Sequence, residues 1–479
     1  MPHFTEFAKS LGKETHTDPG LYGVYPRSVY RTNGGFVYMA DNGAEDVLVV
    51  CNAEGFTGER ADGALLAPLT HANACALRGL FPFTAPAKIL SRDRTFGAGD
   101  RLGIAAPGHL RVFENCAVTP VLAQQSVREL NLTNRTFEDI VDAAAFAVFR
   151  AGYERGFGAD GDHLKTMPEI QSALDAGCSM ITIDCSDHIK TPREVAPDAG
   201  TERFYLNKVF HVEDEEIRFT AKDLDESRAI YSDAIEFIRE VHGTFFSGAY
   251  RRPAELEISI DETQEATTPQ QHFFVASELR RLGVDFATLA PRFIGEFQKG
   301  VDYIGDTDAF ERDFRVHAAI AGHFGYKLSI HSGSDKFSIF PVIAKYAGTK
   351  FHLKTAGTSW LEAMRVVSVS DPGLYRDVHR FALESFAGAR KYYHVSAEAS
   401  NIPSLDSLGD TELPSLFDIS DARQLIHITY GFILNDPELR PRLFGLWRRE
   451  RQAYSDALYA HIGRHVEQVT GTPLRTGKE

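Results

Sequence analysis

The feature that most constrains the fold is a series of eight short extended runs separated mainly by segments of helical periodicity. The runs span residues 118–125, 157–160, 180–184, 256–261, 286–290, 327–331, 351–355 and 392–396. Parallel strands need crossover connections, so eight such units predict an α/β fold with a closed (β/α)8 barrel of the TIM type. A doubly wound open sheet would alternate in the same way, but it would place ligand residues at one switch point, not after nearly every strand.

The segments outside the eight runs suggest additions to the barrel. Residues 1–115 are rich in Gly, Asn, Asp and Pro and predict an N-terminal cap or β-containing domain. The barrel is expected within 116–479, with a helical insertion at about 189–254 because that segment is too long for a simple connection. Further helices are expected between about 410 and 470.

Charge and cysteine content indicate which kinds of molecule the protein binds and the redox state of its thiols. The net charge of −15 disfavours a nucleic-acid or anionic-membrane surface, which needs clustered Lys and Arg. Five scattered cysteines without a CxxC pair predict reduced thiols. No run approaches the roughly 20 apolar residues of a membrane span, and the N-terminus lacks the pattern of a signal peptide. We therefore expect a cytoplasmic, non-membrane protein that acts on a small molecule and could assemble as a homo-oligomer.

Polar residues follow nearly every predicted strand. In a barrel these positions meet at one mouth, so their convergence predicts a shared active site. Individual residues also have simpler explanations: Asp261 could cap the helix expected near residue 269, and Lys354 could pair with a carboxylate. The strand-end residues include Gln124, Asp162, His163, Asp184, Asp261, Glu262, Arg292, His331, Ser334, Lys336 and Lys354.

Histidines at strand ends predict a metal site. His163 and His331 are the best candidate ligands, and His352 is the first choice for the third. Glu257 or Asp184 could replace His352, which could instead be a core histidine bonded to a backbone carbonyl. Glu257 is expected on the inner face of its strand, where burying a carboxylate without a partner would cost free energy.

Several cations are expected at the same mouth. Arg292, Lys336 and Lys354, with the amides around Ser334, could hold a sugar carboxylate or a phosphate. The chain has no dinucleotide-binding fingerprint or phosphate-binding loop in the required context.

Four segments resemble the tagaturonate epimerase family. They are Gly-Ala-Asp-Gly-Asp-His-Leu-Lys at 158–165, Ile-Asp-Glu-Thr at 260–263, His-Ser-Gly-Ser-Asp-Lys-Phe-Ser at 331–338 and Lys-Thr-Ala-Gly-Thr-Ser at 354–359. The Asp-His pair, the segments 180–186 and 255–258 and the His331 motif also look like the strand-end motifs of class II metal-dependent aldolases, more distantly.

The resemblance implies a metal-dependent isomerase that interconverts tagaturonate and fructuronate in uronate catabolism. The metal would be Zn, Mn, Ni, Co or Fe. The inverted carbon is not adjacent to the ketone, so retro-aldol cleavage and re-addition would be required. Asp162 would act as the base and Glu262 or Glu257 as the acid. Lys336, Lys354 or Arg292, with Ser334, would bind the substrate. The alternatives are an aldolase for a phosphorylated ketose and a carbohydrate-binding or regulatory protein on an inactive barrel.

Overall fold

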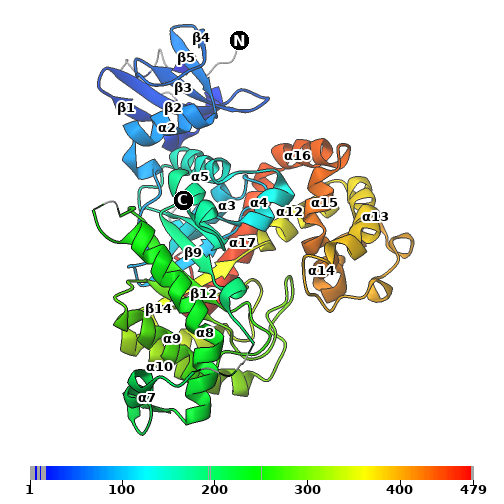
Figure 1. The fold of residues 1–479 in the computed structure, drawn as a ribbon. Helices are drawn as coiled ribbons and strands as arrows, with labels where there is room; N and C mark the ends of the chain where they lie inside the picture. The colour runs from blue at the N-terminus through cyan, green and yellow to red at the C-terminus, as the bar shows by residue number, and fades with distance from the viewer. Residues whose placement is uncertain are drawn as a thin grey trace.

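The computed structural model describes residues 6–7, 11, 18–191, 194, 196–249 and 251–475. Its centre is a closed barrel of parallel strands in the order β12-β13-β14-β15-β6-β7-β8-β9 (Figure 1). The strands are β6 (Arg94–Ala98), β7 (Thr119–Ser126), β8 (Gly158–Leu164), β9 (Met180–Asp184), β12 (Glu255–Ile260), β13 (Thr288–Pro291), β14 (Lys327–Ile330) and β15 (Phe351–Thr355). The predicted (β/α)8 fold is confirmed.

One of the predicted strands was wrong. Residues 392–396 form no strand, and β6 completes the barrel instead. Phe351 of β15 pairs with Arg94, and Thr95 pairs with Thr119 of β7. The barrel therefore begins before the predicted boundary at residue 115. The five residues of β6 carry little periodicity, and only pairing with the distant strand β15 makes them the closing strand.

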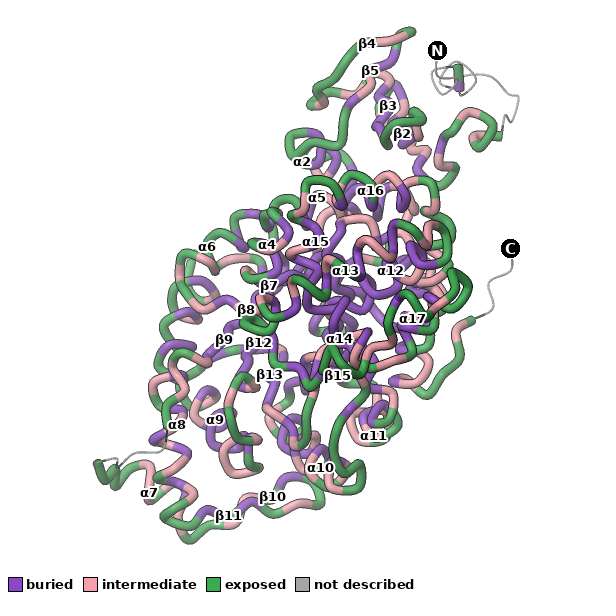
Figure 2. Tube along the Cα trace, turned by 90° about the vertical axis from the view of Figure 1, so that its right-hand side faces the viewer, coloured by how far each residue is buried: buried purple, intermediate pink, exposed green. Residues whose placement is uncertain are grey.

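The N-terminal segment forms the predicted β-containing domain. Its antiparallel sheet has the order β1-β2-β3-β5-β4, and helix α2 (His71–Leu80) joins it to the barrel helix α5 (Phe137–Ala151) through a shared apolar cluster. Both views show this domain at one end of the molecule (Figures 1 and 2). The strands are β1 (Tyr30–Thr32), β2 (Gly35–Asp41), β3 (Asp46–Cys51), β4 (Glu59–Ala61) and β5 (Ala64–Pro68).

The expected insertion between β9 and β12 is only partly helical. It contains helix α7 (Ala199–Tyr205), the hairpin of β10 (Val209–Val212) and β11 (Glu215–Arg218), and helix α8 (Ala221–Val241). Thr220 starts α8 with a capping box to Asp223, which satisfies amides of the first turn. The hairpin was predicted as helical because it is short and most of its charged residues are exposed. In composition it therefore resembles an exposed helix.

Helices surround the strands and extend beyond them. The barrel helices are α3 (Ala106–Glu114), α4 (Val127–Thr133), α5, α6 (Met167–Asp175), α8, α9 (Pro269–Arg281), α10 (Thr307–Phe324), α11 (Phe340–Tyr346) and α12 (Thr358–Ser370). The expected C-terminal helices are α13 (Pro372–Ala389), α14 (Ser420–Ile428), α15 (Tyr430–Asn435), α16 (Leu439–Arg449) and α17 (Arg451–Thr470). Helix α17 returns to the barrel and packs its buried face against it. Among the described residues, no helix combines the length and the apolar content needed to span a bilayer.

Candidate metal centre and cavity

A cavity of about 430 Å³ opens at the carboxyl ends of the barrel strands. Its lining includes Asp162, His163, Glu262, Arg292 and His331. These residues follow or end four different strands, and strand ends of a parallel barrel meet at one mouth. The predicted convergence of these side chains is therefore present in the structure.

Asp162 and His163 reach the cavity together because of a β-bulge. The register between β8 and β9 shifts after Gly161, and His163 has a left-handed φ of +53°. In a regular strand, neighbouring side chains would point to opposite faces. The bulge turns both toward the mouth, which is a common use of bulges near active sites.

His163, Asp261 and His331 form a group that could hold a cation, with one ligand atom from each lying within 4.8 Å of the others. His163 Nδ1 is 2.8 Å from Asp162 Oδ1, which leaves Nε2 for a ligand bond. His331 Nε2 is 2.9 Å from Glu257 Oε1. His331 Nδ1 lies 3.3 Å from Asp261 Oδ1 but is buried without a hydrogen-bond partner. Each imidazole is thus held at one nitrogen by a carboxylate outside the group, as in many metal sites, and the second nitrogen of His331 faces Asp261 within the group.

The prediction of His352 as the third ligand is not met by this geometry. Its Nδ1 lies 3.0 Å from Thr95 Oγ1 inside the barrel, and burial lowers its pKa to about 3. His352 comes two residues before Lys354 on the same face of β15, so it lies roughly 7 Å deeper than the strand end. Asp261, which directly follows β12, takes the third position instead. It does not cap helix α9, whose N-cap is Thr268.

Lys354 lines the cavity and is surrounded by acids on its inner side. Its Nζ lies 2.7 Å from Thr182 Oγ1, 2.8 Å from Asp160 Oδ2 and 3.0 Å from Glu257 Oε1, and it also contacts Asp162. Burial opposes its charge, but the surrounding carboxylates raise the pKa of Lys354 well above the usual value. Lys354 therefore neutralises the acids of the barrel interior, and its role as a substrate ligand stays a prediction.

The same network shifts the pKa values of two acids of β8, Asp160 and Asp162, in opposite directions. Burial tends to raise the pKa of Asp162, but Lys354 and His163 hold it well below the usual value, so Asp162 is ionised. Burial raises the pKa of Asp160 to about 7 despite the attraction of Lys354. Asp160 was not predicted as a site residue, although it ends the run predicted at 157–160, because its partner Lys354 comes from the distant strand β15.

Glu257 orients a histidine and does not face the cavity. It is fully buried, and its Oε2 accepts a 2.5 Å hydrogen bond from Thr288 Oγ1 while Oε1 contacts His331. Its predicted role as a proton donor to the substrate is therefore not supported, whereas Glu262 is exposed and lines the cavity.

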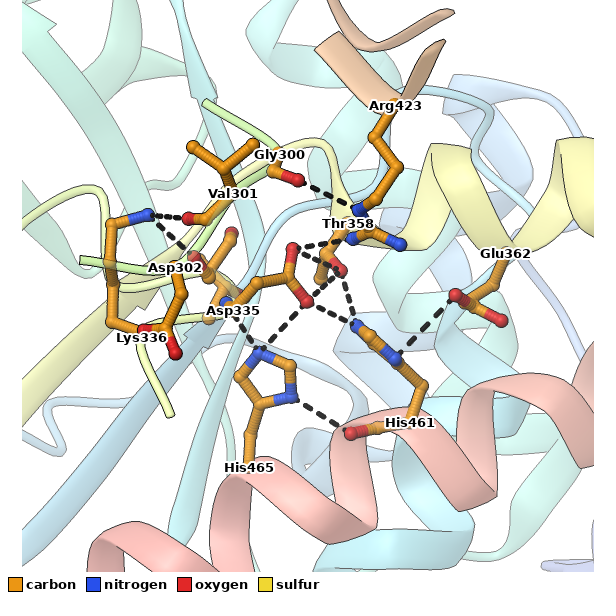
Figure 3. Close-up of polar contacts among 12 residues, drawn as sticks. Gly300, Val301, Asp302, Asp335, Lys336, Thr358, Glu362, Arg423, His461 and His465 are labelled. Atoms are coloured by element: carbon orange, nitrogen blue, oxygen red, sulfur yellow. Dashed lines mark hydrogen bonds and ion pairs between the residues drawn. The ribbon is translucent and has the colours of Figure 1, made fainter. Parts of the chain in front are cut away.

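Lys336, shown in Figure 3, and Ser334 bond to loop backbone and are not among the residues that line the cavity. Lys336 Nζ donates to the carbonyl oxygens of Gln298, Val301 and Ser334 at 2.9, 2.5 and 3.0 Å. Ser334 Oγ donates to the carbonyl of Ala356 and accepts from its amide, at 3.2 and 3.1 Å. Burial lowers the pKa of Lys336 to about 7. Both predictions as substrate ligands are corrected, because backbone partners already satisfy these side chains.

Three other cations do line the cavity. Arg292 was predicted, and its guanidinium makes no ion pair within the described part of the chain. Lys299 and Arg128 were missed. Lys299 Nζ donates to Ser332 Oγ at 2.9 Å, and Arg128 packs over the Tyr393 ring. Lys299 could have been found as a lysine in the long loop after β13, whereas Arg128 lies inside a helix.

Comparisons with known proteins agree over nearly the whole chain. The model of a family described as tagaturonate epimerase matches residues 25–469. A protein of Thermotoga maritima named tagaturonate/fructuronate epimerase is 40% identical over 471 residues, covering 94% of this chain and 97% of that protein. The native crystal structure of a fructuronate-tagaturonate epimerase from Cohnella laeviribosi is 43% identical, with a TM-score of 0.91 over 97% of this chain and 99% of that one. A glycerol complex of the same enzyme has 45% identity and a TM-score of 0.90, covering 93% of this chain and 96% of that one.

Proposed function

Because this chain belongs to the tagaturonate epimerase family, a family of isomerases, we propose that it interconverts D-tagaturonate and D-fructuronate with the help of a divalent cation. The observation that carries this proposal is the group of His163, Asp261 and His331, which opens onto a cavity lined by the cation of Arg292. The proposed substrate is a small acidic sugar. Its hydroxyl and ketone oxygens would need the cation, and its carboxylate would need Arg292.

The three residues suit a catalytic cation. Two imidazoles and one carboxylate match ligand sets that bind Zn, Mn, Ni, Co or Fe and leave coordination positions open. When bound, the cation would act as a Lewis acid on the oxygen atoms of the ketose. Glu257 and Asp162 would orient the two histidines through their second nitrogens.

The remaining side chains at the cavity would handle the proton and the charged end of the substrate. Asp162 would accept the proton of the hydroxyl group on the carbon to be inverted. The bond from this carbon to its neighbour on the ketone side would break, the aldehyde fragment would rotate, and the same bond would re-form on the other face. The proton would then return to the oxygen. Glu262, on the rim, could exchange this proton from the opposite side, and Arg292 with Lys299 would bind the carboxylate.

The test is an interconversion assay on protein of measured metal content. Tagaturonate supplied alone should give fructuronate, followed by NMR, and the reverse reaction should reach the same ratio. Chelation should abolish turnover, and adding back a divalent cation should restore it. Full metal content without interconversion would contradict the proposal. Accumulation of a free aldehyde would favour the aldolase alternative.

The cysteines bear on where the enzyme works. All five are free in the structure, and two of them, Cys178 and Cys185, are buried. Free thiols persist in a reducing compartment. We propose a cytoplasmic location, where sugar acids would be metabolised.

A further inference from the structure

A second cluster of two histidines and one aspartate lies next to the cavity loops (Figure 3). Asp335 comes from the loop after β14, and His461 and His465 come from the C-terminal helix α17. Their nearest ligand atoms also lie within 4.8 Å of one another. By distance alone, this cluster is as good a candidate for a cation as the group at the cavity.

The hydrogen bonds of His465 argue against a cation here. Its Nδ1 is 2.8 Å from the carbonyl oxygen of His461, so Nδ1 carries the proton. The other nitrogen, Nε2, accepts the backbone N–H of Asp335 at 2.8 Å. A neutral imidazole has only one lone pair for a metal, and in His465 that lone pair is already used.

His461 and Asp335 are also fully engaged. His461 Nε2 lies 2.9 Å from Asp335 Oδ1, and Nδ1 lies 3.5 Å from Glu362 Oε1, so carboxylates face both nitrogens. Burial would lower the pKa of His461, but the attraction of Asp335 raises it above the usual value. The other oxygen of Asp335 accepts a 3.0 Å bond from Arg423 Nη2 of helix α14. An arginine in this position would repel a metal cation.

We propose that this cluster is an ion-pair clamp through which His461 and Arg423 position the walls of the active site. Asp335 lies four residues after His331, and its backbone has a left-handed φ of +62°, a conformation that non-glycine residues adopt only when the surroundings hold it. The bonds from His461, His465 and Arg423 provide that support. They fix the short segment that connects the candidate metal ligand His331 to Lys336.

Arg423 extends the clamp to the neighbouring loop, which follows β13. Its Nε donates to the carbonyl of Gly300 at 2.7 Å. Gln424, the next residue of α14, donates to the Gln298 side chain at 3.0 Å and to the Lys299 carbonyl at 3.1 Å. Gln298 and Lys299 line the cavity, and Lys299 donates to Ser332 of the adjacent loop. Helices α14 and α17 therefore hold both loops in one geometry, although neither provides a metal ligand at the cavity.

The clamp is tested with the metal-loaded, full-length enzyme and two variants. His461→Gln removes one charge, and Arg423→Lys keeps the charge but cannot maintain the three bonds of the guanidinium to Gly300, Phe417 and Asp335. We expect each variant to lower kcat by about tenfold or more, with a smaller change in KM and unchanged metal content, because small displacements of catalytic groups are costly. The double variant should lose less than the product of the two effects, since both residues act through Asp335.

The matched control is Arg449→Gln, which removes an exposed charge from helix α16, where Arg449, within the described part of the chain, bonds only to its own helix. It should leave kcat unchanged. Melting temperatures above the assay temperature in all variants separate misplacement from unfolding. Folded variants with wild-type kcat would overturn the proposal, and so would a second equivalent of metal in the wild type that is lost in His461→Gln.

The positioning role rests on the proposed function, but one readout does not need turnover. Amide hydrogen exchange in residues 298–302 and 332–336 should be faster in His461→Gln than in the wild type and in Arg449→Gln. If the wild type proves inactive on tagaturonate, the proposed function fails while faster exchange would still support the clamp. Unchanged exchange in these two segments would overturn the clamp whatever the substrate is.

Discussion

The molecule contains two clusters of two histidines and one aspartate with similar spacing and different chemistry. In the group of His163, Asp261 and His331, a carboxylate outside the group lies at one nitrogen of each imidazole, the second nitrogen of His331 faces Asp261 within the group, and the group opens onto the cavity. In the group of Asp335, His461 and His465, the lone pair of His465 accepts the backbone N–H of Asp335, and Arg423 bonds to the Asp335 carboxylate. The comparison shows that distance between ligand atoms does not define a metal site. The lone pairs that remain after the protein's own hydrogen bonds are counted decide it.

The largest effect should separate the two clusters directly. His331→Ala removes a proposed ligand, so bound metal should be lost and turnover should fall by more than about 10³-fold, since the Lewis acid supplies several kcal/mol of the barrier reduction. His461→Gln, in the other cluster, should keep the full metal content. Elemental analysis of both purified variants tests this. Equal metal loss in the two variants would remove the distinction.

Asp162→Asn should abolish most of the turnover and keep the metal. The amide can still accept a hydrogen bond from His163, but it cannot take a proton from the substrate. We expect kcat to fall by about 10²- to 10⁴-fold, the usual contribution of a general base. Steady-state kinetics on metal-loaded protein provides the measurement. If kcat stays within a few-fold of the wild type, Asp162 serves only to orient His163.

The identity of the third ligand can be decided with a pair of variants. Asp261→Ala should weaken metal affinity by more than the roughly 10- to 100-fold that outer-shell substitutions cost, because it removes a direct ligand. His352→Gln should leave the affinity unchanged, since that side chain lies deeper in the barrel and contacts Thr95. Competition with a chelating dye measures both. The opposite ranking would restore His352 as the ligand.

The smallest effect is a pH dependence of stability in the clamp. The pKa of His461 is raised in the folded state, so its contribution is fully present below its unfolded pKa of about 6.5 and is lost as pH rises through the folded value. The stability gap between the wild type and His461→Gln should therefore be about 1–3 kcal/mol at pH 6, the worth of a charged hydrogen bond, and should shrink toward pH 9.

Denaturant unfolding at pH 6, 7.5 and 9 provides this measurement, with Arg449→Gln again as the control. The carboxyl of Asp335 behaves in the opposite sense. Although burial opposes its charge, His461 and Arg423 hold its pKa well below the usual value. Its contribution is present above its unfolded pKa of about 3.9 and is lost only as pH falls through the lower, folded value. If the difference in unfolding free energy between the wild type and His461→Gln widened with rising pH, the assignment of His461 as a cation would be wrong.

Much of the barrel and part of the site could be predicted from the sequence because strands and their ends are local patterns. The alternation in 256–261 placed Glu257 on the inner face, where the structure has it buried. His163 and His331 were recognised because each follows an apolar run, and strand ends of a barrel meet at one mouth. The closing strand β6 was not predicted, because its assignment depends on pairing with residues of β15 more than 250 positions away.

The sequence by itself determined the barrel, the mouth and two of the three proposed ligands, since hydrophobic periodicity and strand ends are written in neighbouring residues. Tertiary structure alone decided which polar groups remain available. Lys354 meets Asp160 and Glu257, Lys336 meets the carbonyls of another loop, and Asp335 meets a helix 126 to 130 positions later. A buried charge or donor must be satisfied by whatever lies beside it. The partners come from distant segments. The same residue type can therefore be a proposed ligand at one strand end and a hydrogen-bonding link between loops at the next.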